Sequence, residues 1–134
     1  MPEIADPCEA PVALVTGGTR GIGEAVARLL ASQGWRVVAG GVAAAEVTAF
    51  APQPGIEPVL LDVTSDASVA EAVQRCGRLH ALVNCAGVLM RGGAEFGMEA
   101  FERTVAVNLH GTMRSCLAAS SLLEGSRAAS AGSA

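Results

Sequence analysis

A glycine-rich segment near the start of the chain has the composition of a phosphate-binding turn. Residues 16–23 read Thr-Gly-Gly-Thr-Arg-Gly-Ile-Gly, between a short apolar run and a segment with helical periodicity. Gly17, Gly21 and Gly23 would let the backbone turn tightly and approach a pyrophosphate, and the first turn of the following helix would offer free N–H groups. The spacing is G-x-x-x-G-x-G, and a tight strand–helix turn without any ligand is the alternative interpretation.

Polar or small residues recur where later apolar runs end. Asp62 follows one run and could accept a hydrogen bond from an adenine amino group, or it could flank the helix that begins near Thr64. Residues 84–87, Asn-Cys-Ala-Gly, follow another run and leave room for a ribose, and Asn84 could link neighbouring strands. Asn108 lies within a helical pattern, where Asn is unfavourable, so it indicates either a specific hydrogen bond or a solvated helix residue.

The apolar runs that must position these residues alternate with helical patterns along the chain. We expect strands at residues 12–16, 35–39, 59–61 and 79–83, and helices at residues 22–30, 43–50, 65–76 and 98–123, the last divided into two. Such alternation predicts a parallel sheet with right-handed crossovers and helices on both faces. The expected fold class is α/β, as a Rossmann-like three-layer α/β/α unit with strand order 3-2-1-4.

Length and composition are those of a single domain. The chain has 134 residues, and 51% of them are hydrophobic, which is enough for a core. We expect a flexible leader at residues 1–10, a folded unit at residues 11–125 and a flexible Ser/Ala/Gly tail at residues 126–134.

Charge and residue usage exclude several functions. The net charge is −4, so no basic surface for a nucleic acid is expected. The chain has no Tyr, and all of its basic residues are Arg, which excludes Schiff-base chemistry, a P-loop lysine and a Tyr/Lys acid–base pair. The four cysteines lack zinc-ligand spacing, so no metal site is expected, and no apolar run is long enough to span a membrane. Reduced thiols and the lack of a signal peptide predict a cytoplasmic location.

Taken together, the glycine segment, Asp62-Val63, residues 84–87 and Asn108 resemble the motifs of the classical short-chain dehydrogenase/reductase family, in its order and approximate spacing. The resemblance covers the expected folded unit, which corresponds to the N-terminal half of the family's domain. Cys85 departs from the Asn-Asn-Ala-Gly of the family's second motif. The resemblance implies a chain truncated before the fifth strand. The fourth strand would then be an exposed edge, so a homo-oligomer is expected.

The resemblance implies a role for each matching residue. Gly17, Gly21 and Gly23, with the backbone of Ile22, would hold the pyrophosphate of a nicotinamide dinucleotide. Asp62 and Val63 would contact its adenine, and Asn84, Ala86 and Gly87 would line the ribose. Thr19, Arg20 and Gly41 complete the expected cofactor-binding set. Asn108 matches the Asn of the family's catalytic tetrad, which anchors a water in a proton relay.

The implied function is that of an NAD(P)-dependent oxidoreductase, which transfers a hydride between a nicotinamide and a ketone or alcohol substrate. Because the Tyr and Lys of the tetrad are missing, the chain would be inactive alone, and whether it acts as an enzyme stays open. Two alternatives remain. One is a non-enzymatic nucleotide-binding module, and the other is a half-domain that needs a complementing chain.

Two features of the sequence favour NADP over NAD. Family members that prefer NAD usually carry an acid at the end of the second strand, where this chain reads Gly40-Gly41-Val42. Arg20 lies where members that prefer NADP often carry a basic residue, and an Arg there could pair with a 2′-phosphate. The alternative interpretation of Arg20 is a solvated surface residue.

Overall fold

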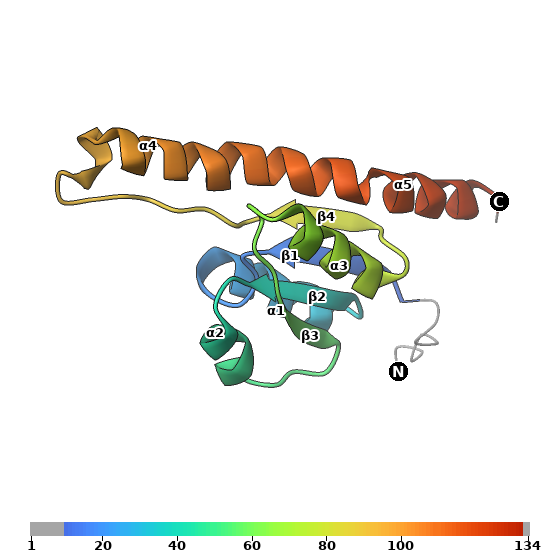
Figure 1. Ribbon diagram of the computed structural model, residues 1–134. Coiled ribbons are helices and arrows are strands. Elements are labelled where there is room, and N and C mark those ends of the chain that lie inside the picture. Colours follow the sequence, from blue (N-terminus) through green and yellow to red (C-terminus); the bar gives the residue numbers. More distant parts are fainter. Residues whose placement is uncertain (1–9, 133–134) are drawn as a thin grey trace.

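A four-stranded parallel sheet forms the centre of the molecule. The computed structural model describes residues 10–132. The strands are β1 (Val12–Thr16), β2 (Arg36–Gly41), β3 (Ile56–Leu60) and β4 (Ala81–Asn84). Their order in the sheet is β3-β2-β1-β4, and every neighbouring pair is parallel (Figure 1). The predicted strand order is therefore confirmed, and the chain reverses its direction of winding between β1 and β4.

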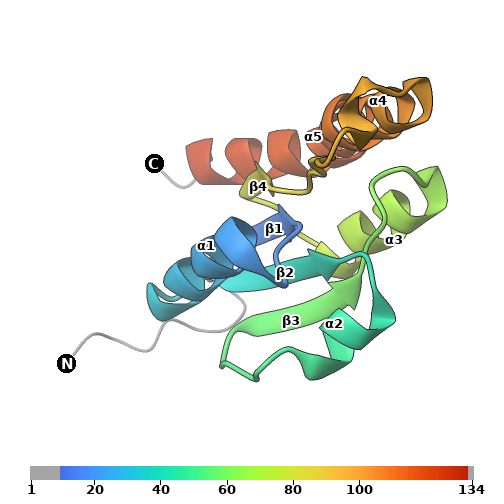
Figure 2. The same ribbon diagram turned by 90° about the vertical axis from the view of Figure 1, so that its left-hand side faces the viewer.

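Helices cover both faces of this sheet. Helix α1 (Gly21–Ser32) lies on one face, and α3 (Asp66–Cys76) and α5 (Gly111–Ala131) lie on the other, while the short α2 (Ala44–Ala49) lies against β2 and β3 (Figure 2). The side chains of β1 alternate between the two sides: Val12 and Leu14 pack with α3 and α5, and Val15 packs with α1. Because β1 is buried on both faces, its sequence is a continuous apolar run. The predicted three-layer architecture is confirmed.

The C-terminal third of the described chain is one long helical rod. After a 3-10 turn at Ala94–Phe96 (η1), α4 (Met98–Val105) continues through a wider π turn at Ala106–His110 (η2) into α5. The sequence predicts two helices here, whereas the structure keeps helical backbone angles throughout the junction. The π turn contains Asn108, and such turns often occur at functional sites.

The structure corrects the expected domain boundaries at the C-terminal end. Helix α5 runs to Ala131, so the prediction of a tail without regular structure is wrong for residues 126–131. This segment is rich in Ala, the strongest helix former. It has no apolar periodicity, and for that reason no helix was predicted there. Residues 1–9 of the expected leader at residues 1–10, and the last residues, 133–134, lie outside the described part of the chain. Among residues 10–132, no helix combines the length and apolar character that crossing a membrane requires.

Candidate functional site

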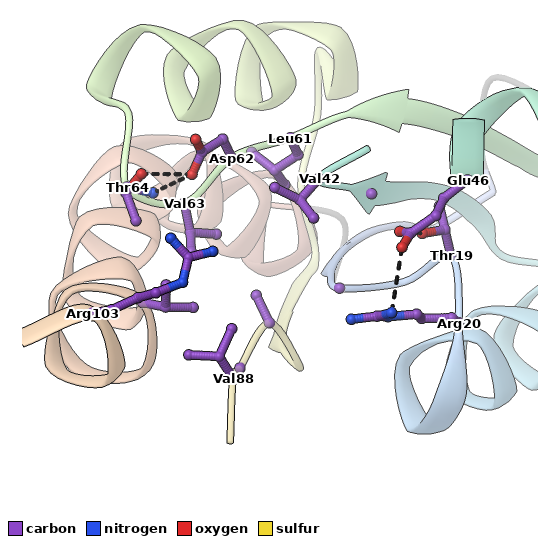
Figure 3. Close-up of a pocket in the computed structure, with 15 residues that line it drawn as sticks. Thr19, Arg20, Val42, Glu46, Leu61, Asp62, Val63, Thr64, Val88 and Arg103 are labelled. Carbon is purple, nitrogen blue, oxygen red and sulfur yellow. Dashed lines mark hydrogen bonds and ion pairs between the residues drawn. The ribbon is translucent and has the colours of Figure 1, made fainter. Parts of the chain in front are cut away.

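A cleft opens at the carboxyl ends of the strands, between the ends of β1, β2 and β4 and the helical rod (Figure 3). Its empty space of about 720 Å³ includes the open solvent at its mouth. Most of the predicted cofactor-binding residues line it: Gly17, Thr19, Arg20, Gly41, Asp62, Val63, Ala86 and Gly87. The point where strand order reverses is the usual place for a ligand in open α/β sheets.

The glycine segment forms a turn with no room for a Cβ at Gly17 or at Gly23. Gly17 has a φ of +60°, and a Cβ built there would lie 2.8 Å from the backbone nitrogen of Ala86. A Cβ on Gly23 would overlap the carbonyl oxygen of Gly17. The turn therefore brings the end of β1, the start of α1 and the segment after β4 into direct backbone contact. That arrangement leaves main-chain groups, rather than side chains, to face a ligand at this end of the cleft.

Three predicted residues of this segment lie beside the cleft rather than in its lining. Gly21, Ile22 and Gly23 form the first turn of α1. Ile22 is 80% exposed and does not line the cleft. The first N–H groups of a helix have no partner within the helix, and this end of α1 has no side-chain cap.

Thr16 joins the first and fourth strands where they end. Its buried hydroxyl accepts hydrogen bonds from the backbone N–H groups of Cys85 and Ala86, at 3.2 and 3.1 Å. A linking role was predicted for Asn84, whose side chain instead donates to Sγ of Cys116 on α5 at 3.6 Å. Asn84 does not line the cleft. The linking role of Thr16 could have been predicted from the sequence, because Thr16 ends a buried apolar strand and a buried hydroxyl needs hydrogen-bond partners.

Asp62 lines the cleft and also begins the loop that leads into α3. Its Oδ1 accepts hydrogen bonds from the backbone N–H and the hydroxyl of Thr64, at 2.9 and 2.7 Å. The hydroxyl bond and then the backbone bond lower the pKa of the Asp62 carboxyl, with smaller contributions from the positive charges of Arg103 and Arg114. The carboxylate is therefore charged at neutral pH. The helix-flanking interpretation is confirmed, and it is compatible with a ligand contact because Asp62 also lines the cleft.

Asn108 makes the specific hydrogen bonds that its place in a helix indicates. Its Oδ1 accepts from the backbone N–H of Val88 at 2.8 Å, and its Nδ2 donates to the carbonyl of Val88 at 3.0 Å. This amide thus pairs with both main-chain groups of one residue, as a neighbouring strand would. It holds the segment after β4 against the helical rod, next to Gly87 and the cleft. The alternative of a merely solvated residue is wrong.

Arg20 faces the cleft and pairs with an acid that the sequence analysis missed. Its Nη1 lies 3.4 Å from Oε1 of Glu46, and the hydroxyl of Thr19 donates to Oε2 of Glu46 at 3.3 Å (Figure 3). Glu46 lies in the first turn of α2, five positions after Gly41. Arg103, from α4, was also missed, and it extends to the cleft beside Val63 (Figure 3). Both enter the site from other elements, so no local motif reveals them.

Neither Cys76 nor Cys85 supplies a reactive thiol to the cleft. Burial raises the pKa of the Cys85 thiol, and burial raises that of Cys76 to about 11. Both thiols are therefore mainly protonated at neutral pH and are weak nucleophiles. Within residues 10–132, no group of three or more His, Cys, Asp or Glu side chains is arranged to hold a metal ion.

Comparisons with known proteins give a consistent result. A family model described as short chain dehydrogenase matches residues 11–133. A short-chain dehydrogenase reductase of Arabidopsis thaliana is 35% identical over 126 residues, covering 89% of this chain and 46% of the relative. A 3-beta-hydroxysteroid dehydrogenase of Comamonas testosteroni is 38% identical over 112 residues, covering 78% of this chain and 44% of the relative.

A solved structure extends the likeness to the fold. A short-chain dehydrogenase/reductase of Serratia marcescens superposes with a TM-score of 0.73 and 32% sequence identity, covering 88% of this chain and 53% of that chain. The chain spans about half the length of the curated relatives and of the solved structure that it matches.

Proposed function

The chain belongs to the short-chain dehydrogenase/reductase family, and from this membership we propose that it is the cofactor-binding half of an NAD(P)-dependent oxidoreductase. Membership implies a nicotinamide dinucleotide cofactor, which would supply or accept a hydride when bound. The reaction proposed for the complete protein is the interconversion of a ketone and an alcohol. The relatives' names supply no substrate for this chain.

The observation that carries the proposal is the close backbone packing around the glycine turn. Side chains are excluded at Gly17 and Gly23, so main-chain N–H groups and the start of α1 border the cleft. A pyrophosphate is a dianion, and it is stabilised by N–H groups and by the positive end of a helix dipole. These residues therefore fit the cofactor that the family implies.

The remaining lining residues would orient the two ends of the cofactor. We assign the adenine to the wall that contains Asp62 and Val63, where an ionised carboxylate faces the cleft beside an apolar side chain. We assign the ribose on the nicotinamide side to Ala86 and Gly87, whose small size leaves the space open. Asn108 would act there as a positioning residue, through its two hydrogen bonds to Val88.

For the choice of cofactor, we propose a modest preference for NADP over NAD, through Arg20. Replacing Arg20 by Ala should weaken NADPH binding by about tenfold and leave NADH binding nearly unchanged, because a charge-assisted hydrogen bond to the 2′-phosphate would be lost. Titration of the protein with each cofactor, followed by nucleotide fluorescence, measures both dissociation constants.

A matched control is available for this substitution. Arg91 is an exposed Arg that does not line the cleft, so Arg91→Ala changes the net charge equally and should leave the ratio of the two affinities unchanged. Equal affinity of the unmodified protein for NADPH and NADH, unaltered by Arg20→Ala, would contradict the proposed role of Arg20.

We further propose that the chain associates with a second copy of itself. β4 is an edge of the sheet, and edge strands carry unpaired backbone groups that favour pairing. Leu109, Met113 and Leu117 recur every four residues along the rod and are each about 60% exposed. Light scattering over a dilution series should show a dimer or larger oligomer, and Met113→Glu should shift it toward the monomer. A monomer at every concentration would contradict this proposal.

A cytoplasmic location also remains a proposal. It is supported by the three cysteines that the structure describes, Cys76, Cys85 and Cys116, all of which are free thiols.

A further inference from the structure

We propose that Glu46 opposes the binding of a 2′-phosphate and is the residue that keeps the discrimination between NADP and NAD small. This inference rests on the proposed function, because it assumes that the cleft binds the adenosine half of a nicotinamide dinucleotide. Glu46 would be a determinant of cofactor specificity that lies on α2. An acid with this function is expected at the end of β2, where this chain has Gly41.

The carboxylate of Glu46 is held in the wall of the cleft by two partners. Thr19 donates its hydroxyl to Oε2 at 3.3 Å, and Arg20 lies 3.4 Å from Oε1. The side chain of Glu46 is 27% exposed, whereas that of Arg20 is 73% exposed. Arg20 is thus the partner that is free to turn toward a ligand, while Glu46 stays beside Thr19 as a fixed negative charge.

Gly41 explains how an acid from α2 reaches the end of β2. A Cβ on Gly41 would overlap the hydroxyl oxygen of Thr19, so a side chain there would push Thr19 away. With Gly41 in place, Thr19 packs over the end of the strand and its hydroxyl reaches Glu46. Glu46 therefore places a carboxylate in the same cleft wall as Gly41, where an acid at the end of the strand would otherwise lie.

The carboxylate of Glu46 should favour the binding of NAD and oppose the binding of NADP. With NAD, it can accept a hydrogen bond from a ribose hydroxyl, which is the usual function of an acid at this position. With NADP, Arg20 must leave Glu46 to reach the 2′-phosphate, and the remaining carboxylate repels that phosphate. The attraction from Arg20 is therefore partly cancelled, and both cofactors are accepted.

Two nucleotides that lack the nicotinamide test this balance in the chain as it exists. Adenosine 2′,5′-bisphosphate carries the 2′-phosphate, and adenosine 5′-monophosphate does not. Glu46→Gln keeps an acceptor for the hydroxyl of Thr19 and removes the charge. It should change the ratio of the two dissociation constants by about tenfold in favour of the bisphosphate, as expected for removing one nearby like charge. Isothermal titration calorimetry measures both constants.

The comparison of two ligands protects the test against a general loss of folding, because such a loss weakens both equally. Glu71, exposed on α3 and outside the cleft, provides the matched control: Glu71→Gln makes the same charge change and should alter the ratio by less than about twofold. A ratio unchanged by Glu46→Gln, with both nucleotides bound, would overturn the role of Glu46 alone. Binding of neither nucleotide to the unmodified chain would overturn the proposed function, and this inference with it.

Discussion

Replacing Gly23 by Ala is expected to abolish measurable dinucleotide binding and to lower the free energy of unfolding by about 1–3 kcal/mol, the usual cost of forcing extra volume into a packed site. The added Cβ would overlap the carbonyl oxygen of Gly17, which is backbone and cannot rotate away. The turn between β1 and α1 would have to open, and the contact of Gly17 with Ala86 would open with it. Urea denaturation and an NADPH titration measure the two effects.

The chain offers a control glycine that is not constrained. Gly125 lies inside helix α5, and a Cβ built there meets nothing within 4 Å. Gly125→Ala should therefore leave cofactor binding intact and raise stability by up to about 1 kcal/mol, since Ala favours helix over Gly by that amount. If Gly23→Ala keeps both the stability and the NADPH affinity of the unmodified chain, the glycine turn is not the phosphate site.

The isolated chain should not reduce ketones or oxidise alcohols at a rate typical of its family. Hydride transfer to a carbonyl develops negative charge on oxygen, which a positioned acid must neutralise, and such general acid catalysis contributes about 10²–10⁴-fold. The chain has neither Tyr nor Lys to serve this purpose. Absorbance of NADPH at high protein concentration, with a panel of ketones, measures the rate.

The other candidate acids in the described chain do not compensate. Burial raises the pKa of the Cys85 thiol, so it is a poor proton donor. His110 lines a groove with Asp66 and Met113 between α3 and α5, outside the cleft. The amide of Asn108 is bound to Val88 and has no pKa in the useful range. Substrate-dependent turnover that Asn108→Ala abolishes would contradict the expectation. Activity regained on adding a polypeptide that carries the part of the relatives that this chain does not span would support a half-domain.

The spacing of apolar residues predicted the arrangement of strands and helices, because the burial of apolar side chains largely determines that arrangement. The continuous apolar run of β1 reflects burial on both faces, and the alternation of strands and helices predicted a parallel sheet. The order β3-β2-β1-β4 was predicted as part of the Rossmann-like fold. Element ends were less predictable: β3 begins at Ile56, whereas the expected strand began at residue 59. Pro58 lies within β3, and an edge strand tolerates a proline.

The candidate site was predictable only as far as its residues are close in sequence. The glycine turn and the Asp62 and Asn108 positions follow from local spacing and local propensity. Glu46 and Arg103 reach the cleft only because α2 and α4 pack beside it, so their contribution depends on tertiary structure. Arg20 was predicted to favour NADP before its ion-pair partner was known. The ion pair with Glu46 changes how strongly Arg20 is expected to favour NADP over NAD.

We propose that the cleft at the carboxyl ends of β1, β2 and β4 binds a nicotinamide dinucleotide. This binding can be tested directly by an NADPH titration followed residue by residue, through the amide signals of ¹⁵N-labelled protein. The largest shifts should arise from the amides of residues 17–23, Val63, Ala86 and Gly87. Shifts confined to the groove between α3 and α5, or no shifts at a large excess of NADPH, would contradict it.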